Sequence, residues 1–182
     1  YQVVFITGQK IISTCNRIIY GSSISVYGES SDMPITEETK VNPILLYGAN
    51  KYLGELYVRC YQQQFGMQYN ILRISDTFGE RDRRKNAVNN FIKSFLDGSQ
   101  IIVNGDGEQL RTYTYVGDMA NAIGLSVNSL KNSTYNVAAE KSISVNNLLE
   151  KLEFLLKVKK FVHFQPKRKD KRNYVFNCSK FK

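Results

Sequence analysis

Two residues four positions apart, Tyr47 and Lys51, could carry out acid–base chemistry. A phenol with an ordinary pKa of about 10 is a poor base at neutral pH, so a tyrosine serves as one only where a nearby cation stabilises its phenolate. Residues four apart on a helix share a face, which would bring the Lys51 ammonium close to the Tyr47 phenol. A Tyr-x-x-x-Lys spacing arises by chance roughly once in such a chain, usually on a helix surface. The pair therefore predicts a proton-transfer site only if the surrounding sequence supports it.

Three segments around the pair supply that support, namely RIIYGSSISVYGE (17–29), PITEET (34–39) and NPILLYGANKYLGE (42–55). Together they closely resemble the extended short-chain dehydrogenase/reductases, especially nucleotide-sugar epimerases of the UDP-glucose 4-epimerase kind, whose pattern is SS-x-x-VYG, P-x-x-E, NP and YG-x-x-K. The resemblance continues through LRISDTFGERD, the segment around Gly-Asp-Gly, STYNVAAEKSISVNNLLE and NCSK. It implies NAD(P)-dependent epimerisation of a nucleotide-diphosphate sugar by hydride removal and return.

The resemblance assigns the catalytic roles to Ser23, Tyr47 and Lys51. Ser23 would hydrogen-bond the reacting sugar hydroxyl and share its proton with Tyr47, which takes or returns that proton. Lys51 would also hold the nicotinamide ribose of the cofactor, NAD or NADP. The implied cofactor-binding residues are Tyr47, Lys51, Ser22 and Ile74.

The resemblance also implies where the nucleotide-diphosphate sugar binds. Arg111 matches the arginine of GDG-x-x-x-R and could clamp a diphosphate in a bidentate manner, although an exposed salt bridge is an alternative role. The other expected substrate contacts are Ser23, Asp76, Asn86, Lys167, Arg168 and Asp170. Two copies of the chain could form a homodimer through the helix that carries Tyr47 and Lys51.

Three features depart from the family pattern. The glycine-rich strand-turn-helix that holds a dinucleotide pyrophosphate is not found in these 182 residues, so we expect a fragment of a longer protein or a truncated reading frame. Asp76 replaces an asparagine that meets the substrate diphosphate, and its carboxylate would repel phosphate unless Arg81 or Arg83 pairs with it. Ile24 and Ser25 stand where 4,6-dehydratases carry an acid, which favours an epimerase or a reductase over a dehydratase.

Two other functions stay open. One is a reductase, dehydratase or decarboxylase of the same family. The second is an inactive remnant that uses its basic tail to bind an anionic partner.

The elements that must position these residues alternate between strand and helix. We expect strands near 17–22, 68–74 and 135–139, helices near 44–64, 88–96 and 118–130 and from Ser144 onward, two short strands within 101–116, a polar loop at 79–86 and a weakly helical segment at 3–15. This alternation predicts an α/β fold, the C-terminal part of a Rossmann-like parallel sheet with a small α/β substrate-binding lobe. The expected division is 1–85 for the partial catalytic region and 86–182 for that lobe with its basic tail.

Charge and hydropathy limit the choice of partners. The net charge is +9, and residues 157–182 hold ten Lys or Arg against the single acid Asp170. Such a run could bind nucleic acid, a membrane surface or a phosphorylated ligand, or it could be a solvated face. A nucleic-acid-binding protein is not expected, because aromatic residues do not interleave with the basic run.

No stretch approaches the roughly 18 apolar residues of a membrane span and the N-terminus does not resemble a signal peptide, so we expect a cytoplasmic protein.

Cysteine and histidine usage argues against metal sites. Cys15, Cys60 and Cys178 are scattered and odd in number, which predicts buried thiols rather than disulfides or a metal cluster. His163 is the single histidine of the chain and is expected to be a core or surface residue.

Overall fold

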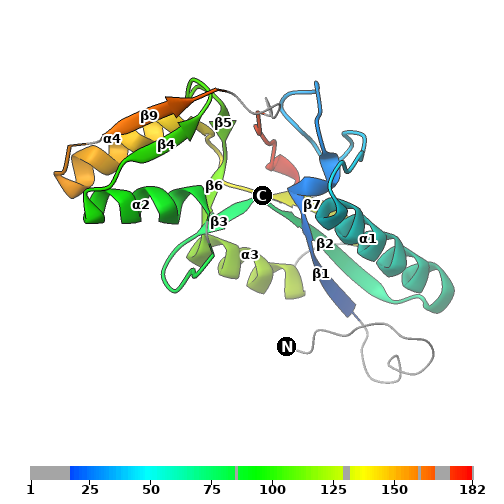
Figure 1. Ribbon diagram of the computed structural model, residues 1–182. Helices are drawn as coiled ribbons and strands as arrows, with labels where there is room; N and C mark the ends of the chain where they lie inside the picture. Colours follow the sequence, from blue (N-terminus) through cyan, green and yellow to red (C-terminus); the bar gives the residue numbers. More distant parts are fainter. Residues whose placement is uncertain (1–16, 85, 129–131, 160, 167–172, 182) are drawn as a thin grey trace.

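The computed structural model describes residues 17–84, 86–128, 132–159, 161–166 and 173–181 (Figure 1). Its helices are α1 (Leu46–Phe65), α2 (Ala87–Asp97), α3 (Val116–Asn128) and α4 (Val145–Leu156). Its strands are β1 (Arg17–Ser23), β2 (Gln68–Ile74), β3 (Asp76–Phe78), β4 (Ile101–Asn104), β5 (Leu110–Arg111), β6 (Tyr113–Tyr115), β7 (Ser133–Val137), β8 (Ile143–Ser144) and β9 (Val162–Gln165). The helix expected at 3–15 lies outside the described residues.

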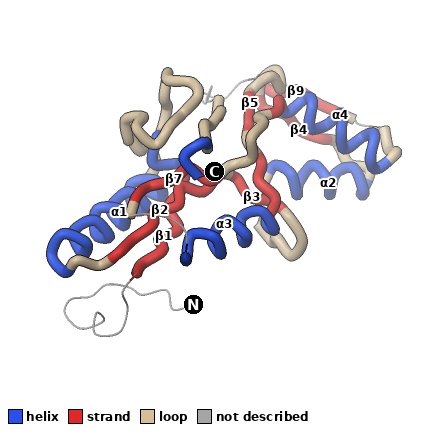
Figure 2. The backbone as a smooth tube through the Cα atoms, turned by 180° about the vertical axis from the view of Figure 1, so that it is seen from behind, coloured by secondary structure: helices blue, strands red, loops and turns tan. Residues whose placement is uncertain are grey.

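A parallel three-stranded sheet in the order β1-β2-β7 forms the centre of the larger lobe. Side chains alternate between the two faces of a strand, so Leu72 and Ile74 pack against α3 while Arg73 points to α1. Figures 1 and 2 show these two helices on opposite faces of the sheet. The predicted α/β class with a Rossmann-like parallel sheet is confirmed.

The smaller lobe packs α2 and α4 against the parallel pair β4–β9 (Figure 2). Its core is aliphatic and aromatic and consists of Val88, Phe91, Phe95, Ile101, Val103, Val145, Leu148, Leu149 and Leu152. Asn86 and Ser144 cap the N-termini of the two helices with their side chains, which satisfies backbone N–H groups that the helix leaves unpaired. The parallel pair β3–β6 lies between the lobes, and β5–β8 is antiparallel.

Most expected elements are present, with shifted ends. α1 begins at Leu46 rather than at 44, and α3 begins at Val116, so Asp118 lies in its first turn. The strand expected after Gly-Asp-Gly is divided into β5 and β6, because β5 pairs with β8 while β6 pairs with β3. The side chain of the buried Thr112, between the two strands, bonds Ser142 Oγ and the Tyr174 carbonyl. The sequence did not predict β3 and β9, and β7 lies at 133–137 rather than 135–139.

Other expectations concern the surface and the lobes. No described helix combines the length and the hydropathy needed to cross a membrane. Cys60 is exposed and Cys178 is half-buried, so neither is the buried thiol that the sequence predicted, and Cys15 lies outside the described residues. His163 is exposed on β9. The division at residue 85 stays a prediction, and β7 and α3, which follow it, pack on the central sheet.

Candidate active site

Tyr47 and Lys51 lie in the first two turns of α1, beside β1 (Figure 1). The Lys51 ammonium donates a 2.8 Å hydrogen bond to the Gly21 carbonyl and lies 5.8 Å from the centre of the Tyr47 ring. It also lies 5.5 Å from the centre of the Tyr20 ring. Tyr47 is 57% exposed, so a ligand can reach its phenol while the cation stays beside it. The predicted pairing of a phenol with a cation is present in the structure.

Ser23 ends β1 and caps the short 3-10 turn Ile24–Tyr27. Its oxygen accepts a 3.2 Å hydrogen bond from the Ser25 N–H, and its hydroxyl donates to Ser25 Oγ at 3.2 Å. A hydroxyl has one donor and two acceptor positions. The capping bond occupies one acceptor, so the hydroxyl can still turn from Ser25 to a ligand.

Gly48 brings the start of α1 against this turn. A methyl group on Gly48 would come within 2.4 Å of the Ser25 carbonyl oxygen. The missing side chain therefore permits a backbone contact that places Tyr47, the preceding residue, near the strand end that carries Ser23.

A buried ion pair that the sequence analysis did not predict lies beneath the site. Arg73 of β2 donates from Nε to Glu55 Oε1 at 3.0 Å and from Nη2 to Glu55 Oε2 at 2.8 Å. The two side chains are 2% and 0% exposed. Burial alone would lower the pKa of Arg73, but the hydrogen bonds and charge of Glu55 outweigh it, and the pKa is raised. The sequence did contain a signal for this ion pair, namely an arginine within the apolar run QYNILRI. A charged side chain in a strand buried on both faces needs a partner.

Two sequence motifs converge on this pair. Tyr27 of the VYG turn accepts a 2.9 Å hydrogen bond from Arg73 Nη1 and donates to Asn136 Oδ1 at 2.6 Å. Glu37 of P-x-x-E accepts from the Asn136 backbone N–H at 2.7 Å, and its carbonyl accepts from Arg73 at 3.3 Å. Burial raises the pKa of Tyr27 to about 12. Both motifs thus support the floor of the site in this structure.

Asp76 and Arg111 flank Tyr113 at the junction of the two lobes. Asp76 is in register with Tyr113 across the β3–β6 pair. Burial raises the pKa of Tyr113 to about 12, with Arg111 lowering it and Asp76 raising it, so both charges act on this phenol. The Arg111 guanidinium lies 5.3 Å from the centre of the Tyr174 ring. Its Nη1 donates a 3.0 Å hydrogen bond to the Leu110 carbonyl.

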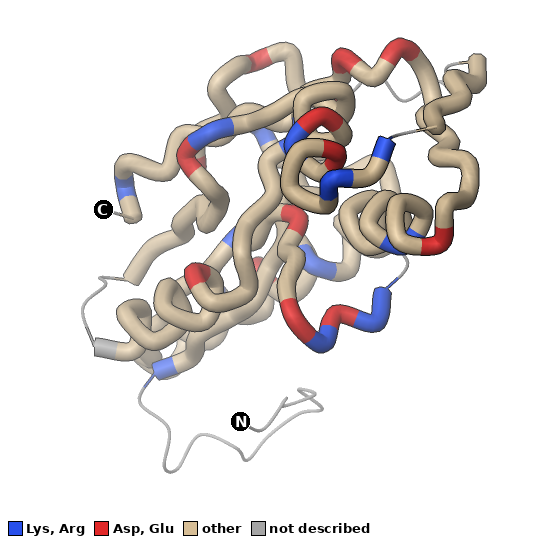
Figure 3. The backbone as a smooth tube through the Cα atoms, turned by 90° about the vertical axis from the view of Figure 1, so that its left-hand side faces the viewer, with Lys and Arg blue, Asp and Glu red and all other residues tan. Residues whose placement is uncertain are grey.

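The loop after β3 carries alternating acidic and basic positions (Figure 3). Arg84 forms a bidentate pair with Asp82, at 2.8 and 2.9 Å, and also donates to the Thr77 carbonyl. Asn86 donates to Asp82 at 2.7 Å. The hydrogen bonds from Arg84 hold the pKa of Asp82 well below its usual range. The hydrogen bonds to Asp82 are the main cause of the raised pKa of Arg84. Smaller contributions come from Asp76 and Tyr47, which therefore lie near this arginine.

The remaining predicted residues are placed as follows. Ser22 is buried and donates to Glu55 Oε1 at 2.6 Å, and Ile74 packs with the α3 core. Their contacts with a cofactor stay predictions. Lys167, Arg168 and Asp170 lie outside the described residues, and no cluster of metal ligands occurs among those that are described.

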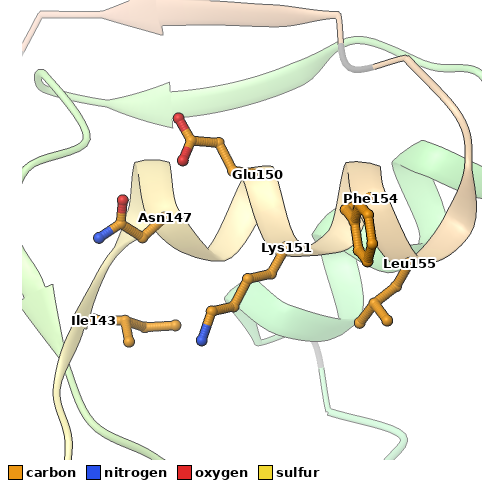
Figure 4. Close-up of a pocket in the computed structure, with 6 residues that line it drawn as sticks. All are labelled: Ile143, Asn147, Glu150, Lys151, Phe154 and Leu155. Atoms are coloured by element: carbon orange, nitrogen blue, oxygen red, sulfur yellow. The ribbon is translucent and has the colours of Figure 1, made fainter.

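A pocket of about 540 Å³ lies on α4, away from these residues (Figure 4). It is lined by Ile143, Asn147, Glu150, Lys151, Phe154 and Leu155. A smaller pocket of about 200 Å³ lies at the Thr77–Arg84 loop. Neither lining includes Tyr47, Lys51 or Ser23. The candidate active site is nevertheless the Tyr47 phenol and the Lys51 ammonium, because they lie together beside the strand whose end carries Ser23.

Comparison with known proteins extends over most of the chain. A family model described as the NAD dependent epimerase/dehydratase family matches residues 7–138. A relative named "Putative UDP-glucose 4-epimerase" from Methanocaldococcus jannaschii is 38% identical over 139 residues, which cover 74% of this chain and 45% of that protein.

Two solved structures share the fold. The UDP-N-acetylglucosamine 4-epimerase from Methanobrevibacter ruminantium, in complex with UDP-N-acetylmuramic acid, matches with a TM-score of 0.84 and 32% identity, covering 90% of this chain and 55% of that one. The UDP-glucose 4-epimerase of Thermus thermophilus, in complex with NAD, matches with a TM-score of 0.81 and 26% identity, covering 91% and 57%. The chain spans about half the length of the relatives that it matches.

Proposed function

The chain belongs to the NAD dependent epimerase/dehydratase family, and from that premise we propose that it forms the proton-transfer and sugar-binding part of a nucleotide-sugar epimerase. The observation that carries the proposal is the Lys51 ammonium held between the Gly21 carbonyl and the Tyr47 ring. A cation in that position stabilises the phenolate that a base needs at neutral pH.

The nicotinamide end of NAD fits the residues present. Among the described residues Lys51 makes one hydrogen bond, so two of the three N–H groups of its ammonium can reach ribose hydroxyls. Ser22 and Ile74 are proposed to lie at the same end of the cofactor. A glycine-rich segment for the pyrophosphate is not part of the 182-residue sequence. When bound, NAD accepts a hydride from the sugar ring and returns it.

The residues of the chain move the proton. The Tyr47 phenolate takes the proton of the reacting sugar hydroxyl, while the Ser23 hydroxyl hydrogen-bonds to the same oxygen. Lys51 stabilises the phenolate before the transfer and keeps the phenol oriented after it. Tyr47 then returns the proton to the sugar oxygen, so the sugar gains and loses no atoms and only its stereochemistry changes.

Ile24 and Ser25 support an epimerase rather than a dehydratase. Ile24 is buried in the core beneath the turn, and Ser25 bonds to Ser23. Water elimination needs a general acid near the leaving hydroxyl, and neither side chain supplies one.

The proposed substrate is a nucleotide-diphosphate sugar. Arg111 and Asn86, with Lys167, Arg168 and Asp170 of the tail, are proposed to contact its diphosphate and nucleotide. The position of Arg111 beside Asp76 and Tyr113 at the lobe junction supports this proposal.

Product analysis on the full-length protein tests the activity. UDP-sugars should convert to their epimers without net change in NADH, whereas a reductase or decarboxylase would change NADH or release carbon dioxide. Tyr47→Phe should reduce kcat by roughly 10²–10⁴-fold, and Tyr61→Phe, farther along the same helix, should leave it unchanged. Undiminished turnover by the Tyr47→Phe variant would contradict the proposal.

We also propose a homodimer through α1. An apolar stripe on the outer side of this helix is exposed and consists of Leu46, Leu53, Leu56 and Tyr57. These residues recur at helical intervals and so share one face, as in helix–helix interfaces. Light scattering should report a dimer for the full-length protein and a monomer for Leu53→Asp. Leu96→Asp, at an exposed position on α2, should stay dimeric, and a Leu53→Asp dimer would contradict the proposed interface.

Cys60 is an exposed thiol, which favours a reducing compartment, and we propose a cytoplasmic location. Cell fractionation tests this, and recovery in an extracellular or membrane fraction would contradict it.

A further inference from the structure

The ion pair between Arg73 and Glu55 joins α1 to the sheet directly below the proposed catalytic residues. Its two parallel N–H···O bonds are 3.0 and 2.8 Å long, and both side chains are almost fully buried. A bidentate arginine–carboxylate pair has a fixed planar geometry. The ion pair therefore restrains both the rotation of α1 and its distance from the sheet. Apolar contacts alone would restrain the helix less.

Arg73 belongs to a row of polar residues across the sheet. Ser22, Arg73 and Asn136 are in register on β1, β2 and β7, one position before Ser23 on β1. Ser22 donates to the Glu55 carboxylate at 2.6 Å, and Tyr27 links Arg73 to Asn136. The Arg73 guanidinium also stacks on the Tyr27 ring at 4.8 Å. Each strand of the central sheet thus contributes to the network that holds Glu55.

Glu55 and the catalytic pair share one face of α1. Tyr47, Lys51 and Glu55 follow at intervals of four, so they lie on successive turns of the helix. Three successive residues of β1 bond to Lys51 and Glu55. The Tyr20 hydroxyl donates to the Lys51 carbonyl, the Gly21 carbonyl accepts from the Lys51 ammonium, and the Ser22 hydroxyl donates to Glu55.

A small displacement of α1 would disturb this register. One residue along a helix corresponds to about 1.5 Å of rise and about 100° of rotation. Even part of that movement would take the Lys51 ammonium from the Gly21 carbonyl, 2.8 Å away.

We infer that Arg73 and Glu55 are positioning residues, which hold α1 on the sheet so that Lys51 stays beside Tyr47. The inference rests on the proposed function, because it concerns the proton-transfer pair. The positioning role can be separated from a role in stability. A buried ion pair can often be replaced by apolar side chains of similar volume with little loss of stability. Such a replacement would retain the fold and remove the directional restraint on α1.

The principal test is therefore the paired variant Glu55→Leu with Arg73→Met in the full-length protein. The inference predicts a folded protein in which kcat at neutral pH falls roughly tenfold while KM for the nucleotide sugar changes less than about twofold. The active base is the phenolate, so a more distant cation shifts the acidic limb of the kcat–pH profile upward by about one pH unit, and the loss recovers at higher pH. The charged or titratable groups that face Tyr47 are Lys51 on its own helix, Tyr20 on β1 and Arg84 in the loop after β3.

Arg59→Met is the matched control. Arg59 approaches the same Glu55 carboxylate at 3.7 Å, but its side chain is 44% exposed. Its removal takes away a cation near Glu55 and a 3.2 Å hydrogen bond to Thr134 of β7. It retains the bidentate pair between Arg73 and Glu55, so the pH profile should not move. A paired variant with an unchanged profile, or an Arg59→Met shift as large as that of the paired variant, would overturn the inference.

Two further measurements cover the other cases. If the paired variant does not fold, Ser22→Ala is the alternative, because it retains the ion pair and removes only the bond from β1 to Glu55. It should shift the acidic limb of the kcat–pH profile in the same direction by a smaller amount, and no shift overturns the inference.

If the native protein converts no nucleotide sugar, the proposed function fails by itself. The phenolate absorbance of Tyr47, measured as the difference from Tyr47→Phe in each background, then reports positioning directly: a higher midpoint in the paired variant supports the inference, and an unchanged one overturns it.

Discussion

Asp76 puts a carboxylate where the proposed substrate would bring a diphosphate. Its charge acts on Tyr113 and on Arg84, which shows that it lies among the groups at the lobe junction. Arg84 itself forms a close ion pair with Asp82. The suggestion from sequence that Arg81 or Arg83 would neutralise Asp76 stays a prediction.

Replacing Asp76 by asparagine should improve substrate binding. The variant removes a like charge from the neighbourhood of the diphosphate while keeping the side-chain volume, so KM for the nucleotide sugar should fall roughly tenfold with little change in kcat. Steady-state kinetics measures the effect. Asp97→Asn, which removes an exposed charge at the end of α2, should leave KM unchanged. An equal or higher KM for Asp76→Asn would place the diphosphate elsewhere.

The proximity of Tyr47 and Lys51 could be predicted from sequence because the two residues are four positions apart on one helix. Their catalytic role stays a proposal. The partners of that pair could not be predicted. The contact of Ser22 with the cofactor stays a prediction. The sequence did not show that strand alternation turns its hydroxyl to Glu55, because it does not show which buried acid meets which strand. Arg73 and Glu55 are 18 residues apart and come together only when α1 packs on the sheet.

At the level of elements, glycine decides how closely α1 approaches the catalytic strand. Gly48→Ala would force its new methyl group to within 2.4 Å of the Ser25 carbonyl oxygen. Because the neighbour is backbone, the helix must shift, and we expect a loss of about 1–3 kcal/mol in the free energy of unfolding. Urea denaturation measures this.

Gly124→Ala is the matched control on α3. Nothing lies within 4 Å of the methyl group there, and alanine is the better helix former by about 1 kcal/mol. The control should therefore stabilise the protein. If both variants changed stability in the same direction, steric contact at Gly48 would not be the cause.

The long helices were predicted to within about two residues, whereas the short strands β3, β8 and β9 were not predicted. α4 begins after Ser144 as expected because Ser144 accepts from the Asn147 N–H, a signal local in sequence. β3 has three residues and exists as a strand only through its pairing with β6. β9 likewise depends on β4, which lies far from it in the chain.

For the whole molecule, buried phenols predict sensitivity to alkali. Burial raises the pKa of Tyr27 to about 12, above its value of about 10 in an unfolded chain. The corresponding stability is fully present below pH 10 and is lost as the pH rises to about 12, by about 3 kcal/mol for this group. The unfolding free energy measured against pH should therefore fall across this window.

Tyr27→Phe should flatten that fall, although the variant loses hydrogen bonds and is less stable at neutral pH. Part of the decline should persist because burial also raises the pKa of Tyr113 to about 12. Tyr57→Phe, at an exposed position, should follow the native curve. A Tyr27→Phe curve parallel to the native one would assign the alkaline loss to other groups.

The hydrophobic core of the smaller lobe shares no residue with the two clusters of the larger lobe, among the residues that the structure describes. Substitutions at sites that share no contacts tend to have additive effects on stability. Changes on α2 or α4 would therefore leave the packing beneath Tyr47 and Lys51 unaltered. Under the proposed function, the smaller lobe would then be free to vary in the sugar that it accepts while the proposed proton-transfer pair keeps its support.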